Sequence, residues 1–272
     1  MVAILLSTYN GEEFLAEQLD SLFNQTYTDF ILYIRDDGSE DQTLKIVSDY
    51  QKKYQNIILI PNSGKNLGPC KSFMSMLEEI EASYYMFCDQ DDVWLPSKIQ
   101  LSLEAIKAEE EHSLNQPIII HTDLIVVDKN LVSISPSLWV HNNIHPSRIT
   151  RQFLPFLNYI TGCTMLFNRA TRDISLSNDD DDQIMHDFWV SICVDSANGI
   201  IVSLPNPTIL YRQHESNTIG ASKDKYLFPK LQRYLHIPDL SYSKRLYMVL
   251  RSRYKISILK YVWLRLCFYI TR

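Results

Sequence analysis

The sequence predicts an α/β fold built on a doubly wound, mostly parallel sheet, with a basic helical extension at the C-terminus. Three observations support this prediction. Short apolar segments alternate with segments of helical periodicity, several apolar segments end in polar clusters, and charge is unevenly distributed along the chain. Hydrophobic residues make up 46% and charged residues 21% of the 272 positions, which is typical of a globular protein and excludes wholesale disorder.

Residues 1–95 contain apolar segments with the length and composition of buried strands. These segments are Val2–Ser7, Phe30–Ile34, Ile57–Ile60 and Tyr84–Cys88. Between them, apolar residues at helical spacing predict helices at Glu12–Gln25, Gln42–Tyr54 and Cys70–Glu81. Because strands and helices alternate, we expect a parallel sheet with crossover helices, as in the nucleotide-binding half of a doubly wound domain.

Residues 96–220 are less regular, and we expect them to form the second half of the main domain. A charged surface helix is predicted at Lys98–Glu111, and a second helix at Gln183–Ala197 follows the acidic run Asp179–Asp182, interpreted as a cap and solvated loop. Short strands are predicted at Ile118–His121, Leu124–Val127, Ile160–Phe167, Ile200–Leu204 and Thr208–Tyr211. Residues 133–158 hold three of the eleven prolines without clear periodicity and are interpreted as a loop region.

The C-terminal residues differ from the rest in charge. Residues 1–225 carry 16 Lys and Arg against 31 Asp and Glu, whereas residues 226–272 carry 10 against 1, so their net charges are −15 and +9. We therefore separate residues 1–220, as the main domain, from a helical, basic tail at 221–272.

The apolar stretch Ile256–Ile270 of this tail is interrupted by Lys260 and Arg265, so it lacks the ~20 apolar residues that span a bilayer. Aromatic residues beside cations, such as Trp263, are typical of a helix in a membrane interface. An anionic membrane surface is one expected partner, and a helix packed on the main domain with a basic outer face is the alternative.

The N-terminus is apolar without a preceding basic region, so we expect no signal peptide. The five cysteines are scattered and form no Cys-x-x-Cys pair, which favours reduced thiols over disulfides or a zinc site. We expect a cytoplasmic protein, peripheral at the inner face of the cell membrane, that binds no nucleic acid.

Three carboxylates, Asp89, Asp91 and Asp92, follow the strand Tyr84–Cys88. Ligands bind at the carboxyl ends of strands in open α/β sheets, and carboxylates clustered there repel one another unless a cation lies among them. Oxygen ligands of this kind suit Mg²⁺ or Mn²⁺ bridging to substrate phosphates. The alternative is a solvated acidic loop that caps the helix beginning near Pro96.

Polar residues also follow the first two strands, at Ser7–Gly11 and Asp36–Ser39. These strand ends should be neighbours, so hydroxyl, aromatic and carboxylate groups would converge on one pocket suited to a nucleoside. Neither a Gly-x-Gly-x-x-Gly nor a Walker-type motif follows these strands, so we expect a metal, and not backbone amides, to hold the phosphates.

The segments Ser7–Asn10, Asp36–Ser39, Asn66–Gly68 and Asp89–Asp92, in this order and spacing, resemble the family-2 glycosyltransferases of the GT-A fold. The resemblance covers about residues 1–215, and it implies that residues 96–220 form an acceptor-binding half. A narrower similarity, to bacterial rhamnosyltransferase-like enzymes of polysaccharide assembly, is carried by three further segments, namely Asn66–Phe73, Thr161–Arg169 and Tyr211–Asn217.

The resemblance implies roles for individual residues in nucleotide binding. Asp37 would hold the pyrimidine base, with Tyr9 stacking on it and Ser7 nearby, and Asp89 would contact the ribose. The remaining residues assigned to nucleotide or phosphate binding are Asn66, Lys71 and Arg212.

The resemblance also implies a metal site and a base. Asp91 would ligate the metal and His214 would complete the site, while Asp92 is either a second ligand or a helix cap. Asp187 would be the base that deprotonates the acceptor hydroxyl, although His186 stands where the family usually has Glu. The alternative for Asp187 is an ordinary acid in the first turn of a helix. No role is assigned to His121, His141 or His145.

These roles imply an inverting, metal-dependent glycosyltransferase that acts on a glycan or lipid-linked oligosaccharide, with dTDP-rhamnose as the first choice of donor and UDP-hexoses as the alternative. A sugar-phosphate nucleotidyltransferase would share the α/β domain and the carboxylates, but should show a Gly-rich basic loop after the first strand, which Ser7–Asn10 is not. A non-catalytic sugar-nucleotide-binding or glycan-binding module would have no need of Asp187 as a base.

Overall fold

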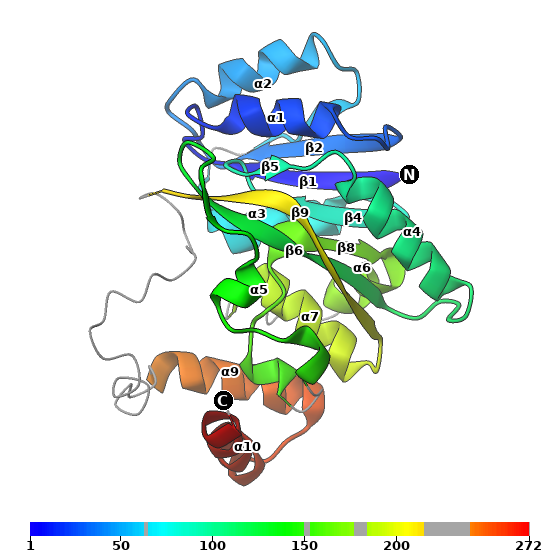
Figure 1. Ribbon diagram of the computed structural model, residues 1–272, viewed down its shortest axis with the longest axis vertical. Coiled ribbons are helices and arrows are strands. Elements are labelled where there is room, and N and C mark those ends of the chain that lie inside the picture. The colour runs from blue at the N-terminus through cyan, green and yellow to red at the C-terminus, as the bar shows by residue number, and fades with distance from the viewer. Residues whose placement is uncertain (63–64, 150–152, 177–183, 215–239, 272) are drawn as a thin grey trace.

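The computed structural model describes residues 1–62, 65–149, 153–176, 184–214 and 240–271. Within these ranges, nine strands form one sheet in the order β3-β2-β1-β4-β8-β6-β9-β5, with β7 paired to β6 (Figure 1). The strands are β1 (Val2–Thr8), β2 (Phe30–Asp36), β3 (Ile57–Leu59), β4 (Tyr84–Cys88), β5 (Val93–Trp94), β6 (Ile118–Asp128), β7 (Ser133–Ser135), β8 (Met165–Asn168) and β9 (Ile200–Gln213).

Helices flank the sheet, and three short 3₁₀ turns interrupt the connections (Figure 1). The helices are α1 (Leu15–Phe23), α2 (Thr43–Gln51), α3 (Gly68–Glu79), α4 (Lys98–Glu110), α5 (Leu138–His141), α6 (Arg169–Leu176), α7 (His186–Ser196), α9 (Leu240–Tyr254) and α10 (Ile258–Thr271). The 3₁₀ turns are η1 (Pro146–Arg148), η2 (Leu154–Phe156) and η3 (Gly162–Thr164).

The parallel sheet predicted for the first 95 residues is confirmed, since β1 pairs in parallel with β2 and β4, and β2 with β3. Side chains alternate across a strand, and in β1 both faces are buried. Ile4 belongs to the apolar cluster that includes α1, α2 and α4, whereas Leu5 belongs to the cluster that includes α3, α7 and α9. The strand order reverses between β1 and β4, so the carboxyl ends of these strands form the crevice of a doubly wound sheet.

The second half departs from the prediction in the continuity of its strands. Ile118–His121 and Leu124–Val127 are parts of one strand, β6, and β9 likewise joins the two predicted segments at 200–204 and 208–211. Between the two predicted strands, at Asp123, the pairing of β6 with β9 shifts in register, and Asp123 pairs with Pro207. A bulge therefore accommodates residues that looked like a strand end.

Other boundaries also differ from the expectation. The strand predicted at Ile160–Phe167 begins only at Met165, because residues 162–164 form the turn η3, and helix α6 directly after β8 was not predicted. The region 133–158 contains the short elements β7, α5, η1 and η2. The helix predicted at Lys98–Glu111 is present, but its first residue, Lys98, is fully buried and not on a charged surface.

The C-terminal helices pack on the main body. This packing was one of the two alternatives considered for the tail. Leu246, Val249 and Leu250 of α9 are at most 2% exposed and belong to the same apolar cluster as Trp189 of α7. None of the described helices is both long and apolar enough to cross a bilayer. The acidic run Asp179–Asp182 and the proposed boundary at residue 220 lie outside the described residues.

Candidate functional site

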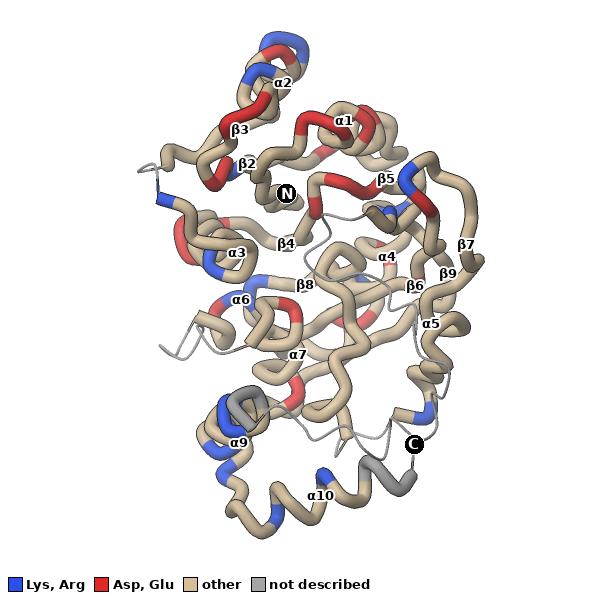
Figure 2. Tube along the Cα trace, turned by 90° about the vertical axis from the view of Figure 1, so that its left-hand side faces the viewer, with Lys and Arg blue, Asp and Glu red and all other residues tan. Residues whose placement is uncertain are grey.

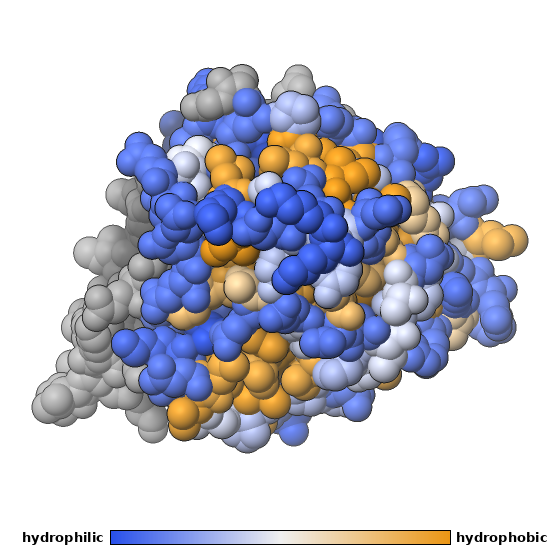
Figure 3. Space-filling model, turned by 90° about the horizontal axis from the view of Figure 1, so that it is seen from above, coloured by the Kyte–Doolittle hydropathy of each residue, from blue (hydrophilic) through white to orange (hydrophobic). Residues whose placement is uncertain are grey.

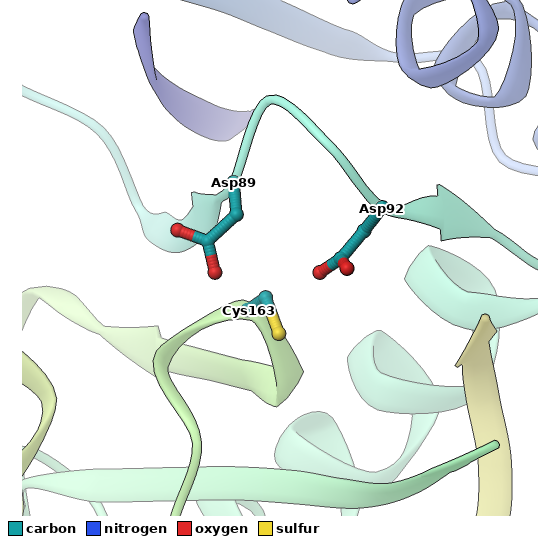
Figure 4. Close-up of side chains that lie close together, drawn as sticks. All are labelled: Asp89, Asp92 and Cys163. Carbon is teal, nitrogen blue, oxygen red and sulfur yellow. The ribbon is translucent and has the colours of Figure 1, made fainter. Parts of the chain in front are cut away.

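The loop between β4 and β5 carries two carboxylates that point into the same space (Figure 4). Oxygen atoms of Asp89 and Asp92 and the thiol of Cys163, which comes from η3, lie within 4.8 Å of one another. Asp92 is fully buried, and its Oδ1 accepts a hydrogen bond of 3.1 Å from the backbone N–H of Arg212. Asp92 therefore joins this loop to the end of β9, and it also belongs to the cluster with Asp89 and Cys163 that could hold a metal ion.

Asp91 and His214 lie side by side, although 123 positions separate them in the chain. The Nε2 atom of His214 is 2.7 Å from Oδ2 of Asp91, and both side chains are largely buried. The imidazole also packs against Phe14 at a ring-centroid distance of 4.7 Å, which limits its rotation. A carboxylate oxygen and an imidazole nitrogen held at this separation form a donor pair that suits Mn²⁺ and, less well, Mg²⁺.

Arg212 holds this part of the site together. Its Nε donates to the carbonyl of Asp91 at 2.7 Å, its Nη1 to the carbonyl of Lys129 at 2.6 Å, and its Nη2 to Glu17 on α1. The side chain is 2% exposed, and its guanidinium lies over the ring of Phe14. Since Nε, Nη1 and Nη2 each donate to a protein acceptor, Arg212 positions the Asp91 loop, and its contact with a phosphate stays a prediction.

Asp187 lies in the first turn of α7, next to η3. Its Oδ1 accepts hydrogen bonds from the backbone N–H of Phe188 at 2.6 Å and from Asn158 Nδ2 at 3.3 Å, and its Oδ2 accepts from the N–H of Gly162 at 3.2 Å. The N-terminus of a helix favours negative charge at this position. The close approach explains the glycine, because a Cβ at Gly162 would lie 2.9 Å from His186 Nε2 and 3.3 Å from the Cβ of Asp187.

The carboxylates of the two halves influence one another electrostatically. Burial, followed by the negative charges of Asp91 and Asp187, raises the pKa of Asp89 to about 7. Burial, followed by the charges of Asp91 and Asp89, raises the pKa of Asp92 well above its usual range. Asp187 is thus close enough to the β4–β5 loop for its charge to act there. A cation among these groups would relieve their repulsion.

Asp37, at the end of β2, is tied to its own strand and to the turn before α3. Its carboxylate accepts hydrogen bonds from the guanidinium of Arg35 and from the backbone N–H groups of Leu67, at 2.9 Å, and Gly68, at 2.7 Å. Gly68 adopts a φ of 75°, which favours glycine at this turn. A pyrimidine bound at Asp37 would share the carboxylate with these internal donors.

Tyr9 projects from the end of β1 with half of its surface exposed, so its ring is accessible to a planar ligand. Gln90 holds its backbone from the neighbouring strand end, with Oε1 accepting from the Tyr9 N–H at 2.9 Å and Nε2 donating to the Tyr9 carbonyl at 3.0 Å. A Cβ at Gly11 would lie only 2.3 Å from Gln90 Oε1. The glutamine amide thus lies directly against this glycine.

The other residues expected to bind the nucleotide lie around the same edge. The Ser7 hydroxyl is 2.7 Å from that of Ser72 on α3, which in turn accepts a hydrogen bond from Arg35. Asn66 is exposed and caps the turn into α3 through the N–H of Gly68, and Lys71 is exposed on that helix. The fold therefore brings the predicted residues to the carboxyl ends of β1, β2, β4 and β9.

Sequence reasoning assigned no role to Gln90, Arg35 or Lys98, which support this edge from within. Arg35 stands directly before the Asp36-Asp37 pair, so a cation inside a strand beside two acids was the available signal. Lys98 is fully buried, its Nζ lies 4.5 Å from the centroid of the Trp94 ring, and burial lowers its pKa to about 8. No pattern in the sequence distinguishes this lysine from those on the surface.

Comparison with known sequences agrees with this geometry. The family described as "Glycosyl transferase family 2" matches residues 3–175. The chain is 29% identical over 235 residues to the dTDP-rhamnosyl transferase RfbG of Shigella flexneri, which covers 81% of this chain and 76% of that protein. It is 34% identical over 93 residues to a poly(ribitol-phosphate) beta-glucosyltransferase of Bacillus spizizenii, covering 34% of this chain but only 15% of that protein.

Solved structures show the same fold. The structure of S. aureus TarS 1-349 in complex with UDP-GlcNAc has a TM-score of 0.57 at 20% identity, covering 94% of this chain and 73% of that one. The mannosyltransferase PcManGT of Pyrobaculum calidifontis, in complex with GDP-Man and Mn2+, has a TM-score of 0.60 at 14% identity, covering 94% of this chain and 64% of that one. These similarities confirm the predicted GT-A fold. Because the family match extends over more than half of its length, the chain belongs to glycosyl transferase family 2 and is a glycosyltransferase.

Proposed function

We propose that the protein is an inverting, metal-dependent glycosyltransferase that transfers a sugar from a nucleotide diphosphate to a hydroxyl of a glycan or lipid-linked oligosaccharide. The observation that carries this proposal is the convergence of three separate segments at one edge of the sheet. The segments are the β4–β5 loop with Asp89 and Asp91, the end of β9 with His214, and the start of α7 with Asp187. His214 lies 2.7 Å from Asp91, and the charge of Asp187 contributes to raising the pKa of Asp89. A donor site and a base next to each other are what a single displacement requires.

The donor would bind across the ends of β1, β2 and β4. In this proposal Tyr9 stacks on the base, Asp37 accepts a base N–H, and Asp89 contacts the ribose. Ser7, Asn66 and Lys71 complete the nucleotide site, the last by its charge. The internal hydrogen bonds of Asp37 support the assignment in part, because they fix the direction of its carboxylate, and a ligand would find it pre-oriented.

The residues present fit a divalent cation. Asp91 and His214 supply an oxygen and a nitrogen ligand 2.7 Å apart, and the neighbouring acids provide a strongly negative surrounding. A bound Mn²⁺ or Mg²⁺ would stabilise the negative charge that develops on the diphosphate leaving group. Asp92 is assigned to the anchoring of β9, and Arg212 to the positioning of the Asp91 loop.

Asp187 is the proposed base. Its carboxylate would accept the proton of the acceptor hydroxyl while that oxygen forms a bond to the anomeric carbon and the bond to the diphosphate breaks. The N–H groups of Gly162 and Phe188 donate to this carboxylate and fix its direction. One displacement without a covalent intermediate inverts the configuration at the anomeric carbon.

For the donor we propose dTDP-rhamnose, because the dTDP-rhamnosyl transferase of Shigella flexneri is the relative that shares the most length with this chain among those named above. A UDP-linked glucose, galactose or N-acetylhexosamine is the alternative. The beta-glucosyltransferase of Bacillus spizizenii supports glucose, and the TarS complex with UDP-GlcNAc supports an N-acetylhexosamine. We place the reaction in the cytoplasm at the inner face of the cell membrane, where a lipid-linked acceptor would be available.

A donor screen tests the proposal. The full chain would be incubated with dTDP-, UDP- and GDP-sugars, with Mn²⁺ or with EDTA, and the release of nucleoside diphosphate followed. We expect release from one class of donor, and loss of that release in EDTA. Equal release in EDTA would contradict the metal dependence. Absence of both release and nucleotide binding by calorimetry would overturn the proposed donor site.

A further inference from the structure

Helix α10 exposes an apolar surface that the described part of the fold leaves uncovered. Five large apolar side chains on it are between 48% and 79% exposed, a concentration not found on the other described helices. They are Ile258, Leu259, Val262, Trp263 and Leu266. Contiguous exposed apolar patches of this kind mark an interaction site, in contrast to isolated exposed residues, which need no explanation.

These five residues lie on one face of the helix. At 3.6 residues per turn their positions fall within an arc of about 140°. Arg265 falls about 20° beyond one edge of this arc and Lys260 about 60° beyond the other, while Tyr261, which is 5% exposed, falls about 60° beyond the edge next to Arg265. Helix α10 thus presents an apolar face with a cation on each flank, and we call the five residues the α10 face.

The packing of the tail fixes the direction of the α10 face. Tyr261 donates from its hydroxyl to the carbonyl of Ser243 on α9 at 3.0 Å, and its ring packs against Tyr247 and Phe156. Arg265 donates to the Tyr261 hydroxyl at 2.6 Å. The inner side of α10 is therefore attached to the protein, and the α10 face is directed outward.

Helix α9 is itself fixed to the main body. The Tyr254 hydroxyl donates to Asp195 of α7 at 2.6 Å, and the guanidinium of Arg253 lies 4.5 Å from the centroid of the Trp189 ring. Together with the buried leucines of α9, these contacts attach α9 firmly to the core. A surface on α10 would therefore hold the whole enzyme at a fixed orientation.

Charge indicates what covers the α10 face. The helices α9 and α10 contain no Asp or Glu, and Figure 2 shows basic residues on both. The cations of residues 240–271 are Lys244, Arg245, Arg251, Arg253, Lys255, Lys260 and Arg265. A second copy of the chain seated on the same face would bring these cations together, which disfavours a symmetric dimer. An anionic lipid surface would attract them, by ~1 kcal/mol for each cation near it.

We infer that α10 lies in the plane of an anionic membrane, with the α10 face inserted among the lipids and Trp263 at the level of the headgroups. This inference rests on the proposed membrane location but not on the donor or the chemistry. Helices α1 and α2 lie at the other end of the long axis (Figure 1), and the described surface at that end is mostly hydrophilic with smaller apolar areas between (Figure 3). The acidic body would thus face away from the anionic surface.

The test compares the full chain with the double variant Leu259→Gln/Trp263→Gln in sedimentation with vesicles. Both residues are exposed, so the variant should fold normally. Leu114→Gln is the matched control, because Leu114 is 82% exposed and lies far from α10. With vesicles of phosphatidylglycerol and phosphatidylcholine, we expect the double variant to bind about tenfold more weakly and the control to bind as the unmodified chain does.

Two further readouts separate the possible outcomes. The fluorescence of Trp263 should shift to the blue with anionic vesicles, and this shift should be absent in Trp263→Gln. Unchanged vesicle binding in the double variant would overturn the inference. So would the finding that the unmodified chain binds no vesicles but forms a dimer in solution, and that the double variant is a monomer. Donor turnover in solution should be equal in the double variant and the unmodified chain, so a failure of the donor screen leaves the vesicle result interpretable.

Discussion

Two regions of the molecule expose different side chains and hold them in different ways. One is the edge of the sheet at the carboxyl ends of β1, β2 and β4, here called the site edge, and the other is helix α10. At the site edge, polar side chains are fixed by hydrogen bonds from distant segments, as when Asp37 accepts from Arg35, Leu67 and Gly68. On α10, apolar side chains are exposed, and burial of the opposite face holds the helix.

The difference has a physical consequence. Hydrogen bonds fix the direction of single atoms, which a chemical reaction requires, whereas one-sided burial fixes only the direction of a surface. Replacing one side chain should therefore have a large effect at the site edge and a small effect on the α10 face. The predictions below test this contrast, beginning with the largest effect.

Asp91→Asn should reduce donor turnover on the order of 10³-fold, because a bound cation contributes several kcal/mol of transition-state stabilisation and the amide is a poor ligand. Turnover as a function of Mn²⁺ concentration measures the loss. Asp49→Asn is the control, since Asp49 is a partly exposed acid on α2 that pairs only with Lys45 and Lys52 among the described salt bridges. Unaltered Mn²⁺ dependence in Asp91→Asn would remove Asp91 from the metal site.

Two leucines of the tail should differ strongly in their effect on stability. Leu250 is 1% exposed, so Leu250→Ala should lower the free energy of unfolding by about 2–4 kcal/mol through the cavity it leaves. Leu259 is 79% exposed, so Leu259→Ala should change it by no more than about 0.5 kcal/mol. Urea denaturation measures both, and equal losses would show that the α10 face is not exposed in solution.

Gly11→Ala should weaken donor binding about tenfold, because its Cβ would displace the Gln90 amide and break two hydrogen bonds worth ~1 kcal/mol each. The backbone of Gly11 needs no left-handed conformation, so the effect should come from the clash. Calorimetry of nucleotide binding in a double-mutant cycle with Gln90→Ala checks this. In the Gln90→Ala background the added methyl should cost little, and additive losses would refute the clash.

Metal binding should release a proton near neutral pH. Burial and the charges of Asp91 and Asp187 raise the pKa of Asp89 to about 7, which favours its protonated form near neutral pH, and a cation bound nearby would lower that pKa. We expect more proton release on Mn²⁺ binding near neutral pH than at higher pH, with apparent Mn²⁺ affinity falling as the pH drops. Calorimetry in buffers of different ionisation enthalpy measures the release, which should vanish in Asp89→Asn.

Much of the first half could be predicted from sequence because its signals are local. The alternation of apolar segments and helical periodicity gave β1 to β4 and α1 to α3 within a few residues, and the polar clusters marked the strand ends. The candidate site residues came from motif resemblance, and the fold brings them to one edge.

The second half was less predictable because its elements depend on distant contacts. The continuity of β6 and β9 depends on their mutual pairing across a bulge, and no single segment shows that. The burial of Lys98 under the site and the use of Arg212 as a support for Asp91 depend on tertiary packing. Charged residues are usually exposed, so sequence favoured a surface or phosphate role for both.

The most direct test of the central claim, that donor site and base meet at one edge, is to measure transfer and donor binding together in Asp187→Asn. Removal of a general base should reduce transfer by roughly 10²- to 10⁴-fold. The dissociation constant of the donor should stay within about twofold of that of the unmodified chain. The melting temperature controls for the loss of the Gly162 and Phe188 hydrogen bonds. Transfer at the unmodified rate, or a loss of donor binding equal to the loss of transfer, would contradict the assignment of Asp187 as the base.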